Sequence, residues 1–146
     1  MIVKKTSIFP ASQEEVFSRL QHLETLQYIA APLATFSPTE TNKDFTWQAG
    51  ASSSYHLKLW GFIPLGIHSI RIERFDHNGI QSYEHNKHVP VWNHLITLNA
   101  KGDQTEYTDE VEIHAGWKTV FVWLWAKAFY SHRQKKWIRL LKSNKK

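Results

Sequence analysis

The chain has 146 residues, of which 42% are hydrophobic and 14% aromatic, with seven tryptophans and one methionine. This length and apolar content fit a single domain, residues 1–146, and exclude an intrinsically disordered chain. The absence of cysteine excludes disulfides, thiolate catalysis and zinc sites built on sulfur. The formal net charge is +5, and much of it lies in the final segment "RQKKWIRLLKSNKK", residues 133–146.

The basic C-terminal segment has two interpretations. Its cations can complement the dipole of a solvated helix end, or they can attract an anionic membrane surface or a partner. No zinc-finger spacing, RNA-binding signature or phosphate loop is present, so we expect no specific nucleic-acid binding. The start, "MIVKKTSIFP", lacks the features of a signal peptide, and we expect a cytoplasmic location.

The first third of the chain predicts one strand and one or two short helices. "IVKKTSIF", residues 2–9, is predicted as a strand that stops at Pro10. The following "SQEEVFSRL" predicts a helix, because Ser12 and Glu15 have the spacing of a capping box and the apolar residues share one face. A second short helix is predicted over "ETLQYI", residues 24–29, ending at Pro32.

From about Leu33 to Gly116 the apolar residues recur with period two, which is typical of strands. "SSYHLKLW" places Tyr55, Leu57 and Leu59 on one face, and "GIHSIRIERF" does the same for His68, Ile70 and Ile72. The turn segments "DHNG" and "KGDQ" separate the later strands, residues 80–88, 91–100 and 105–115. Strands joined by such short turns are antiparallel neighbours.

The segment from Trp117 to Lys146 predicts one long helix with an apolar stripe of Val122, Trp125, Phe129, Trp137, Leu140 and Leu141. Its first part, "TVFVWLWAKAFY", is apolar almost all round. As a helix it spans about 18 Å, too short for the roughly 30 Å hydrocarbon core, so we expect no transmembrane segment. The outer side chains Phe121, Trp123 and Leu124 are left for a covering loop, a lid over a cavity, or a second copy of the chain in a homodimer.

This order of elements resembles the SRPBCC superfamily, which comprises START, polyketide-cyclase and birch-pollen-allergen-type helix-grip proteins. The resemblance rests on "IFPASQEEVFSRL", on "TDEVEI" in the last strand and on "FYSHRQKKWIRLL" in the closing helix. It implies an α+β fold in which a curved antiparallel sheet wraps around the long C-terminal helix, with a largely apolar cavity between them. It also implies binding of lipids, sterols, polyketides or hormones and, in a few members, cyclisation or dehydration. The fold alone does not choose among these functions.

Hairpin register predicts which side chains share the inner face of the sheet. With "KGDQ" as a turn, the facing pairs are Trp92 and Ile113, His94 and Val111, Ile96 and Asp109, and Leu98 and Tyr107. The inner face is then apolar except for His94 and Asp109, which are diagonal neighbours. The hairpin through "DHNG" is predicted to add Tyr83 and His85, and His85 lies opposite His94 if the connection "HVPV" closes with four residues. An inward cluster of His68, His85, His94 and Asp109 follows, provided that no slip or bulge reverses the faces.

Three interpretations of this cluster remain open. The side chains can satisfy one another's hydrogen bonds, as buried polar groups must. They can orient the polar end of an apolar ligand. They can also perform chemistry, with Asp109 orienting His94 as a general base in a cyclase or dehydratase. No close His-x-His pair favours zinc, and we expect neither a metal nor a cofactor.

Other residues extend the predicted site. Arg133 lies on or next to the inner stripe, where it can meet an anionic ligand group or Asp109, or extend to the rim. Trp47 with Gly50, and Trp60 to Pro64, are placed either at a cavity mouth or in ordinary turns.

We therefore expect the protein to bind a hydrophobic small molecule or lipid. A ligand-binding protein without catalytic activity is favoured over an enzyme. The residues expected to line the site are Tyr55, Leu57, Leu59, His68, Ile70, Tyr83, His85, Trp92, His94, Ile96, Tyr107, Asp109, Val111, Trp125, Phe129 and Arg133.

Overall fold

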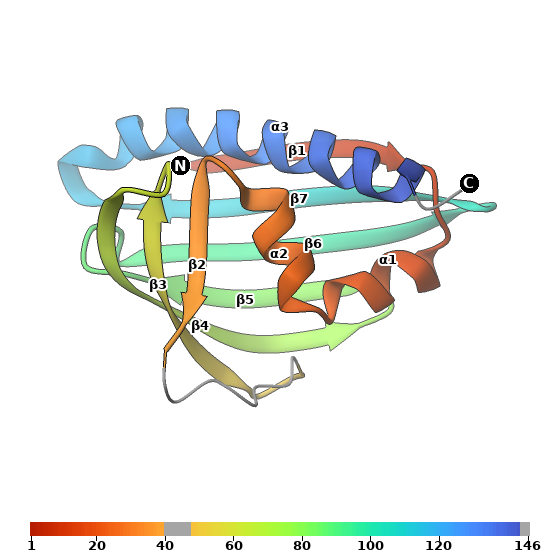
Figure 1. The fold of residues 1–146 in the computed structure, drawn as a ribbon, viewed down its shortest axis with the longest axis horizontal. Helices are drawn as coiled ribbons and strands as arrows, with labels where there is room; N and C mark the ends of the chain where they lie inside the picture. Colours follow the sequence, from red (N-terminus) through yellow and green to blue (C-terminus); the bar gives the residue numbers. More distant parts are fainter. Residues whose placement is uncertain (40–47, 144–146) are drawn as a thin grey trace.

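The computed structural model describes residues 1–39 and 48–143, so the prediction for Trp47 lies outside the described residues. The chain forms one antiparallel sheet of seven strands in the order β1-β7-β6-β5-β4-β3-β2, with a long helix, α3, along it (Figure 1). The elements are β1 (Ile2–Phe9), α1 (Gln13–Leu20), α2 (Leu23–Ala30), β2 (Ala34–Pro38), β3 (Ser52–Leu59), β4 (Ile63–Asp76), β5 (Gly79–His85), β6 (Val91–Lys101), β7 (Gln104–His114), the 3-10 turn η2 (Gly116–Lys118) and α3 (Thr119–Ser143). The predicted α+β helix-grip architecture is confirmed.

The first helix begins where the capping pattern predicts. The side chain of Ser12 accepts a hydrogen bond from the backbone N–H of Glu15 at 3.2 Å, which satisfies one of the otherwise unpaired donors of the first turn. Val16 is fully buried, and α2 follows after a short break to lie next to α3 across the open side of the curved sheet (Figure 1).

The β6–β7 hairpin has the predicted register. His94 pairs with Val111, Ile96 with Asp109, and the inner side chains of both strands are buried. The outward residues of these strands are half-buried or exposed, as the alternation requires.

The β4–β5 hairpin corrects the predicted inner face. The register shifts between Ile72 and Arg74, so Glu73 is an extra residue in β4. Such a bulge moves every later residue of the partner strand to the opposite face. Ser82 and Glu84 therefore face inward, and the inward placement of Tyr83 and His85 is wrong.

His85 is exposed and pairs with Ser69, whereas His94 pairs with Ser82. The expected four-residue closure at "HVPV" is also wrong, because Asn86 shapes a different loop. Its side-chain Oδ1 accepts hydrogen bonds from the backbone N–H groups of His88 and Val89, both at 2.9 Å.

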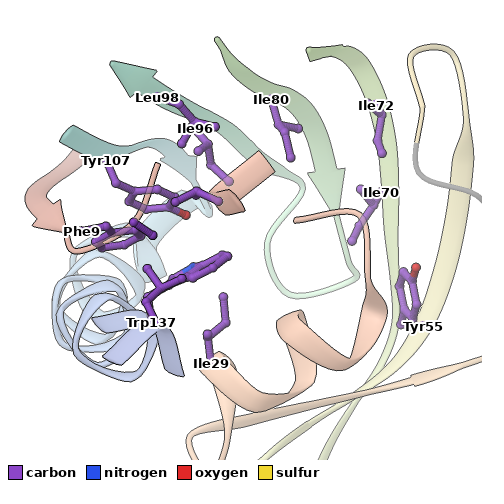
Figure 2. Packing of buried hydrophobic residues seen from close by; sticks show 13 residues of the cluster. Phe9, Ile29, Tyr55, Ile70, Ile72, Ile80, Ile96, Leu98, Tyr107 and Trp137 are labelled. Atoms are coloured by element: carbon purple, nitrogen blue, oxygen red, sulfur yellow. The ribbon is translucent and has the colours of Figure 1, made fainter. Parts of the chain in front are cut away.

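The tight core lies where the C-terminal half of α3 meets β1 and β7. Phe9 stacks on Tyr107 with ring centroids 4.4 Å apart, and Trp137 of α3 packs against both rings (Figure 2). The strands further along the sheet curve away from α3. Their inner side chains, such as Ile70 and Ile72, lie on the concave face of the sheet, which α2 faces from the other side (Figure 2).

The N-terminal half of α3 is less covered. Trp123 lies at the edge of the sheet, where its Nε1 donates to the carbonyl of Ile2 at 2.8 Å and the ammonium of Lys127 lies 4.6 Å from its ring centre. Phe121 and Leu124 are 66% and 53% exposed in the part of the chain that the structure describes. Within that same part, no helix has both the length and the apolar character needed to cross a membrane.

Candidate ligand-binding cavity

A cavity of about 520 Å³ lies between the inner face of the sheet, the two short helices and α3. This volume lies within the roughly 300–1,000 Å³ of small-molecule sites. Most of the lining is apolar, with Ile29 from α2, Ile70 from β4, Ile96 from β6 and Phe129 from α3 on its different walls. Trp117 and Phe121 line the cavity and are also 82% and 66% exposed, so they mark its opening to solvent.

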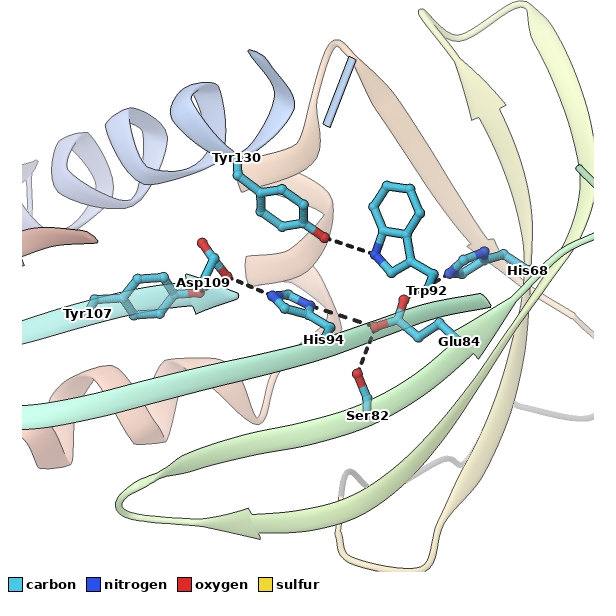
Figure 3. A network of polar contacts seen from close by, with 8 residues as sticks. All are labelled: His68, Ser82, Glu84, Trp92, His94, Tyr107, Asp109 and Tyr130. Atoms are coloured by element: carbon cyan, nitrogen blue, oxygen red, sulfur yellow. Dashed lines mark hydrogen bonds and ion pairs between the residues drawn. The ribbon is translucent and has the colours of Figure 1, made fainter. Parts of the chain in front are cut away.

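A chain of polar side chains, joined by hydrogen bonds and one ion pair, crosses one wall of the cavity (Figure 3). His94 Nε2 donates to Asp109 Oδ1 at 2.7 Å, and His94 Nδ1 lies 3.7 Å from Glu84 Oε2. Glu84 Oε2 also accepts a hydrogen bond from the hydroxyl of Ser82 at 2.7 Å. The imidazole of His94 is thus held between two carboxylates.

His68 completes the chain, and its neighbours determine which nitrogen carries the proton. The Oδ1 of Asn86 is occupied by two backbone donors, so the Asn86 amide nitrogen faces His68 Nδ1 at 3.0 Å and donates to it. The proton of a neutral His68 ring is therefore on Nε2, which donates to Glu84 Oε1 at 2.8 Å.

The network shifts the pKa values of its members. Burial alone would raise the pKa of Glu84, but the hydrogen bond from His68 and the nearby ring of His94 outweigh burial and lower it strongly. Burial likewise opposes the ionised form of Asp109, yet the hydrogen bond from His94 and the charge of Arg133 lower its pKa. For His94, burial would lower the pKa, but the hydrogen bond to Asp109 and the nearby carboxylate of Glu84 instead raise it. The ionised forms are thus stabilised by one another.

Asp109 also joins the sheet to α3. It accepts hydrogen bonds from the Tyr107 hydroxyl at 3.2 Å and from Gln134 Nε2 at 3.0 Å. Gln134 in turn donates to the carbonyl of Lys5 at 2.8 Å, so this side chain connects α3 with β1 and β7.

Arg133 lies next to this network and is 6% exposed, so its predicted inner position is confirmed and the rim position is wrong. The guanidinium carbon lies 5.1 Å from the ring centre of Tyr130 and 5.7 Å from that of Phe129. Burial alone would lower its pKa, but the negative charge of Asp109 outweighs burial and raises it, so the group is a buried cation.

The structure places most of the predicted site residues on the cavity wall. Those that line it are Leu57, Leu59, His68, Ile70, Trp92, His94, Ile96, Trp125, Phe129 and Arg133. Four further predicted residues face inward but are covered by neighbouring side chains: Tyr55, Tyr107, Asp109 and Val111. Asp109, for example, is covered by Gln134, which is hydrogen-bonded to it. Tyr83 and His85 lie on the other face, because of the bulge at Glu73.

The tip of the β3–β4 hairpin, with Trp60, lies outside the cavity lining. Leu59 and Leu65 at the base of this hairpin belong to the lining.

The cavity also contains polar residues that the sequence analysis did not identify. Glu84 and Ser82 face inward only because of the bulge at Glu73. No pattern in the sequence of β4 indicates this extra residue. Tyr130 also lines the cavity, and its helical spacing from Arg133 is the sequence signal that indicates it. Among the described residues, no group of three or more metal-ligating side chains could hold a metal ion.

A family model described as a domain of unknown function (DUF8410) matches residues 7–141. The chain belongs to this family. No curated protein matches it in sequence.

Solved structures resemble it across the whole chain. A START superfamily protein from Mycobacterium smegmatis is 13% identical with a TM-score of 0.74, and the match covers 97% of each chain. Ara h 8.0201 is 12% identical with a TM-score of 0.70, covering 98% of each chain. DynU16, from the dynemicin biosynthetic locus, is 15% identical with a TM-score of 0.65, covering 98% of this chain and 48% of its own. At such identities the likeness concerns the fold alone, and the DUF8410 chain shares the helix-grip fold of these structures.

Proposed function

We propose that the protein binds a hydrophobic small molecule or lipid in the cavity between the sheet and α3. The observation that carries this proposal is the cavity itself, about 520 Å³ in volume and mostly apolar in its lining. A void of this size would normally be filled by core side chains, because protein interiors are close-packed. An apolar ligand would recover the lost contacts, and a few polar groups on one wall suit a site that orients such a ligand.

The polar network does not favour the enzymatic alternative. A general base needs an unprotonated nitrogen within reach of the substrate. Both ring nitrogens of His94 are directed at carboxylates, and its raised pKa favours the protonated form. We therefore do not propose a cyclase or dehydratase activity.

The proposal is tested with Nile red, a neutral apolar dye that fluoresces when it leaves water. We expect saturable binding to the wild-type chain and a loss of affinity of about tenfold or more in Leu26→Trp, because Leu26 lines the cavity and the larger ring occupies it. Glu24→Trp adds the same side chain at an exposed position of the same helix and should bind like the wild type. No saturable binding, or equal loss in both variants, would count against the proposal, provided that circular dichroism shows both variants folded.

A further inference from the structure

Arg133 is a buried cation whose hydrogen-bonding capacity is unused. Its side chain lines the cavity and is 6% exposed. No acceptor among the described residues takes a hydrogen bond from its guanidinium, and Nε is enclosed without any partner. A buried charged donor without an acceptor is costly, and arginine presents five N–H groups in a rigid fork.

The neighbouring carboxylates already serve other donors. Asp109 accepts from His94, Tyr107 and Gln134, and Glu84 accepts from His68 and Ser82. Asp109 stabilises the positive charge of Arg133 through space, as its effect on the pKa indicates. It provides no acceptor for the guanidinium N–H groups in this arrangement.

Tyr130 presents a second unused donor beside the first. Its hydroxyl oxygen accepts a hydrogen bond from Trp92 Nε1 at 3.0 Å (Figure 3). Its own proton reaches no acceptor in the described part of the chain, and burial raises the pKa of Tyr130 far above its ordinary value, so the proton stays in place. Tyr130 lies one helical turn before Arg133 on α3, and both side chains line the cavity.

We propose that Arg133 and Tyr130 bind the anionic head of an amphipathic ligand, a carboxylate whose hydrocarbon part fills the apolar remainder of the cavity. This inference rests on the proposed function and names the ligand class of the same site. The planar guanidinium donates in parallel to two carboxylate oxygens, a geometry that a lysine ammonium does not reproduce. The Tyr130 hydroxyl donates to one of the same oxygens. The protonated ring of His94 lies between Glu84 and Asp109, and its positive charge limits the repulsion that these two carboxylates exert on a bound anion.

The test compares two ligands of one chain length, dodecanoic acid and dodecan-1-ol, as competitors of bound Nile red at neutral pH and below their aggregation concentrations. We expect the acid to compete about tenfold or more better than the alcohol against the wild-type chain. Arg133→Gln should remove this preference and leave the alcohol largely unaffected, and Arg133→Lys should restore only part of it. Arg139→Gln changes an exposed arginine on the same helix and should keep the wild-type preference.

Tyr130→Phe provides a second variant that keeps the ring and removes only the hydroxyl. We expect it to weaken the acid several-fold more than the alcohol, so the test stands even if Arg133→Gln does not fold. Equal competition by acid and alcohol in the wild type, or an equal loss of both in Tyr130→Phe and in folded Arg133→Gln, would overturn the inference while leaving the proposed function intact. Absence of Nile red binding to the wild type would overturn both.

Discussion

At the scale of single residues, His94 is the group on which the inner polar network depends. Its ring lies between Asp109 and Glu84, and all three side chains have almost no contact with solvent. Buried charges of this kind persist only when each has a partner, and removing one partner from such a pair typically costs about 3–5 kcal/mol. The network therefore links the protonation of a few side chains to the stability of the fold.

This linkage predicts how stability varies with pH. The lowered pKa values of Glu84 and Asp109 give a contribution that is present above their ordinary values, near 4, and is lost as the pH falls. The raised pKa of His94 gives a contribution that is fully present below its ordinary value of about 6.5 and is lost as the pH rises through the folded value. We expect the free energy of unfolding, measured by urea denaturation from pH 3 to 9, to be greatest at about pH 5 to 6.5.

His94→Gln provides the control for the alkaline side of this profile. It removes the titrating imidazole and should flatten the decline above about pH 6.5, at a cost in overall stability. Wild-type and His94→Gln chains with the same slope in this range would show that His94 is not responsible.

At the scale of elements, α3 has two halves with different surroundings. The C-terminal half is amphipathic, and Trp137 and Leu141 are fully buried against the sheet and the short helices. The N-terminal half borders the cavity, with Phe121 at its opening, and it exposes Leu124, which does not belong to the lining. The N-terminal half also packs on the sheet, through the buried side chains of Ala126, Phe129 and Tyr130.

Two leucines of this helix allow a matched comparison. Leu141→Ala should reduce the free energy of unfolding by about 2–5 kcal/mol, because it leaves a void in a packed region. Leu124→Ala should change it by no more than about 0.5 kcal/mol, because this side chain is 53% exposed. Guanidinium denaturation of both variants measures the difference. A large loss for Leu124→Ala would mean that its exposed face is covered in solution.

At the scale of the whole molecule, the network joins the two sides of the cavity. Its members come from β4, β5, β6 and β7, and Asp109 continues it to Gln134 on α3. Trp92 of β6 and Tyr130 of α3 form a second link between sheet and helix. A ligand in the cavity would contact the sheet, α2 and α3 together, and its site would be lost on unfolding.

Ligand binding should therefore stabilise the whole fold. A ligand present at 100 times its dissociation constant adds about 2.7 kcal/mol to the free energy of unfolding when the unfolded chain does not bind it. We expect the thermal unfolding midpoint of the wild-type chain to rise with ligand concentration, and that of Leu26→Trp to respond much less. Saturable dye fluorescence without any shift of the midpoint would indicate binding outside the folded cavity.

Local sequence patterns were sufficient for much of this architecture. The alternation along β6 and β7 and the intervening turn placed His94 and Asp109 correctly on one face, because pleat and hairpin geometry depend on adjacent residues. Ser12 correctly marked the start of α1, and helical spacing placed Arg133 on the inner side of α3.

Other features were decided only by the tertiary structure. The extra residue Glu73 in β4 turned Glu84 inward and His85 outward, because register depends on how two strands settle against the core. The unused donors of Arg133 and Tyr130 become visible only when every neighbouring acceptor is in place, since their isolation is a property of the whole cavity wall. The amino-acid sequence by itself therefore determined the helices, most of the strands and the faces of β6, β7 and α3 through short-range periodicity. Long-range packing determined which polar groups meet and which remain available to a ligand.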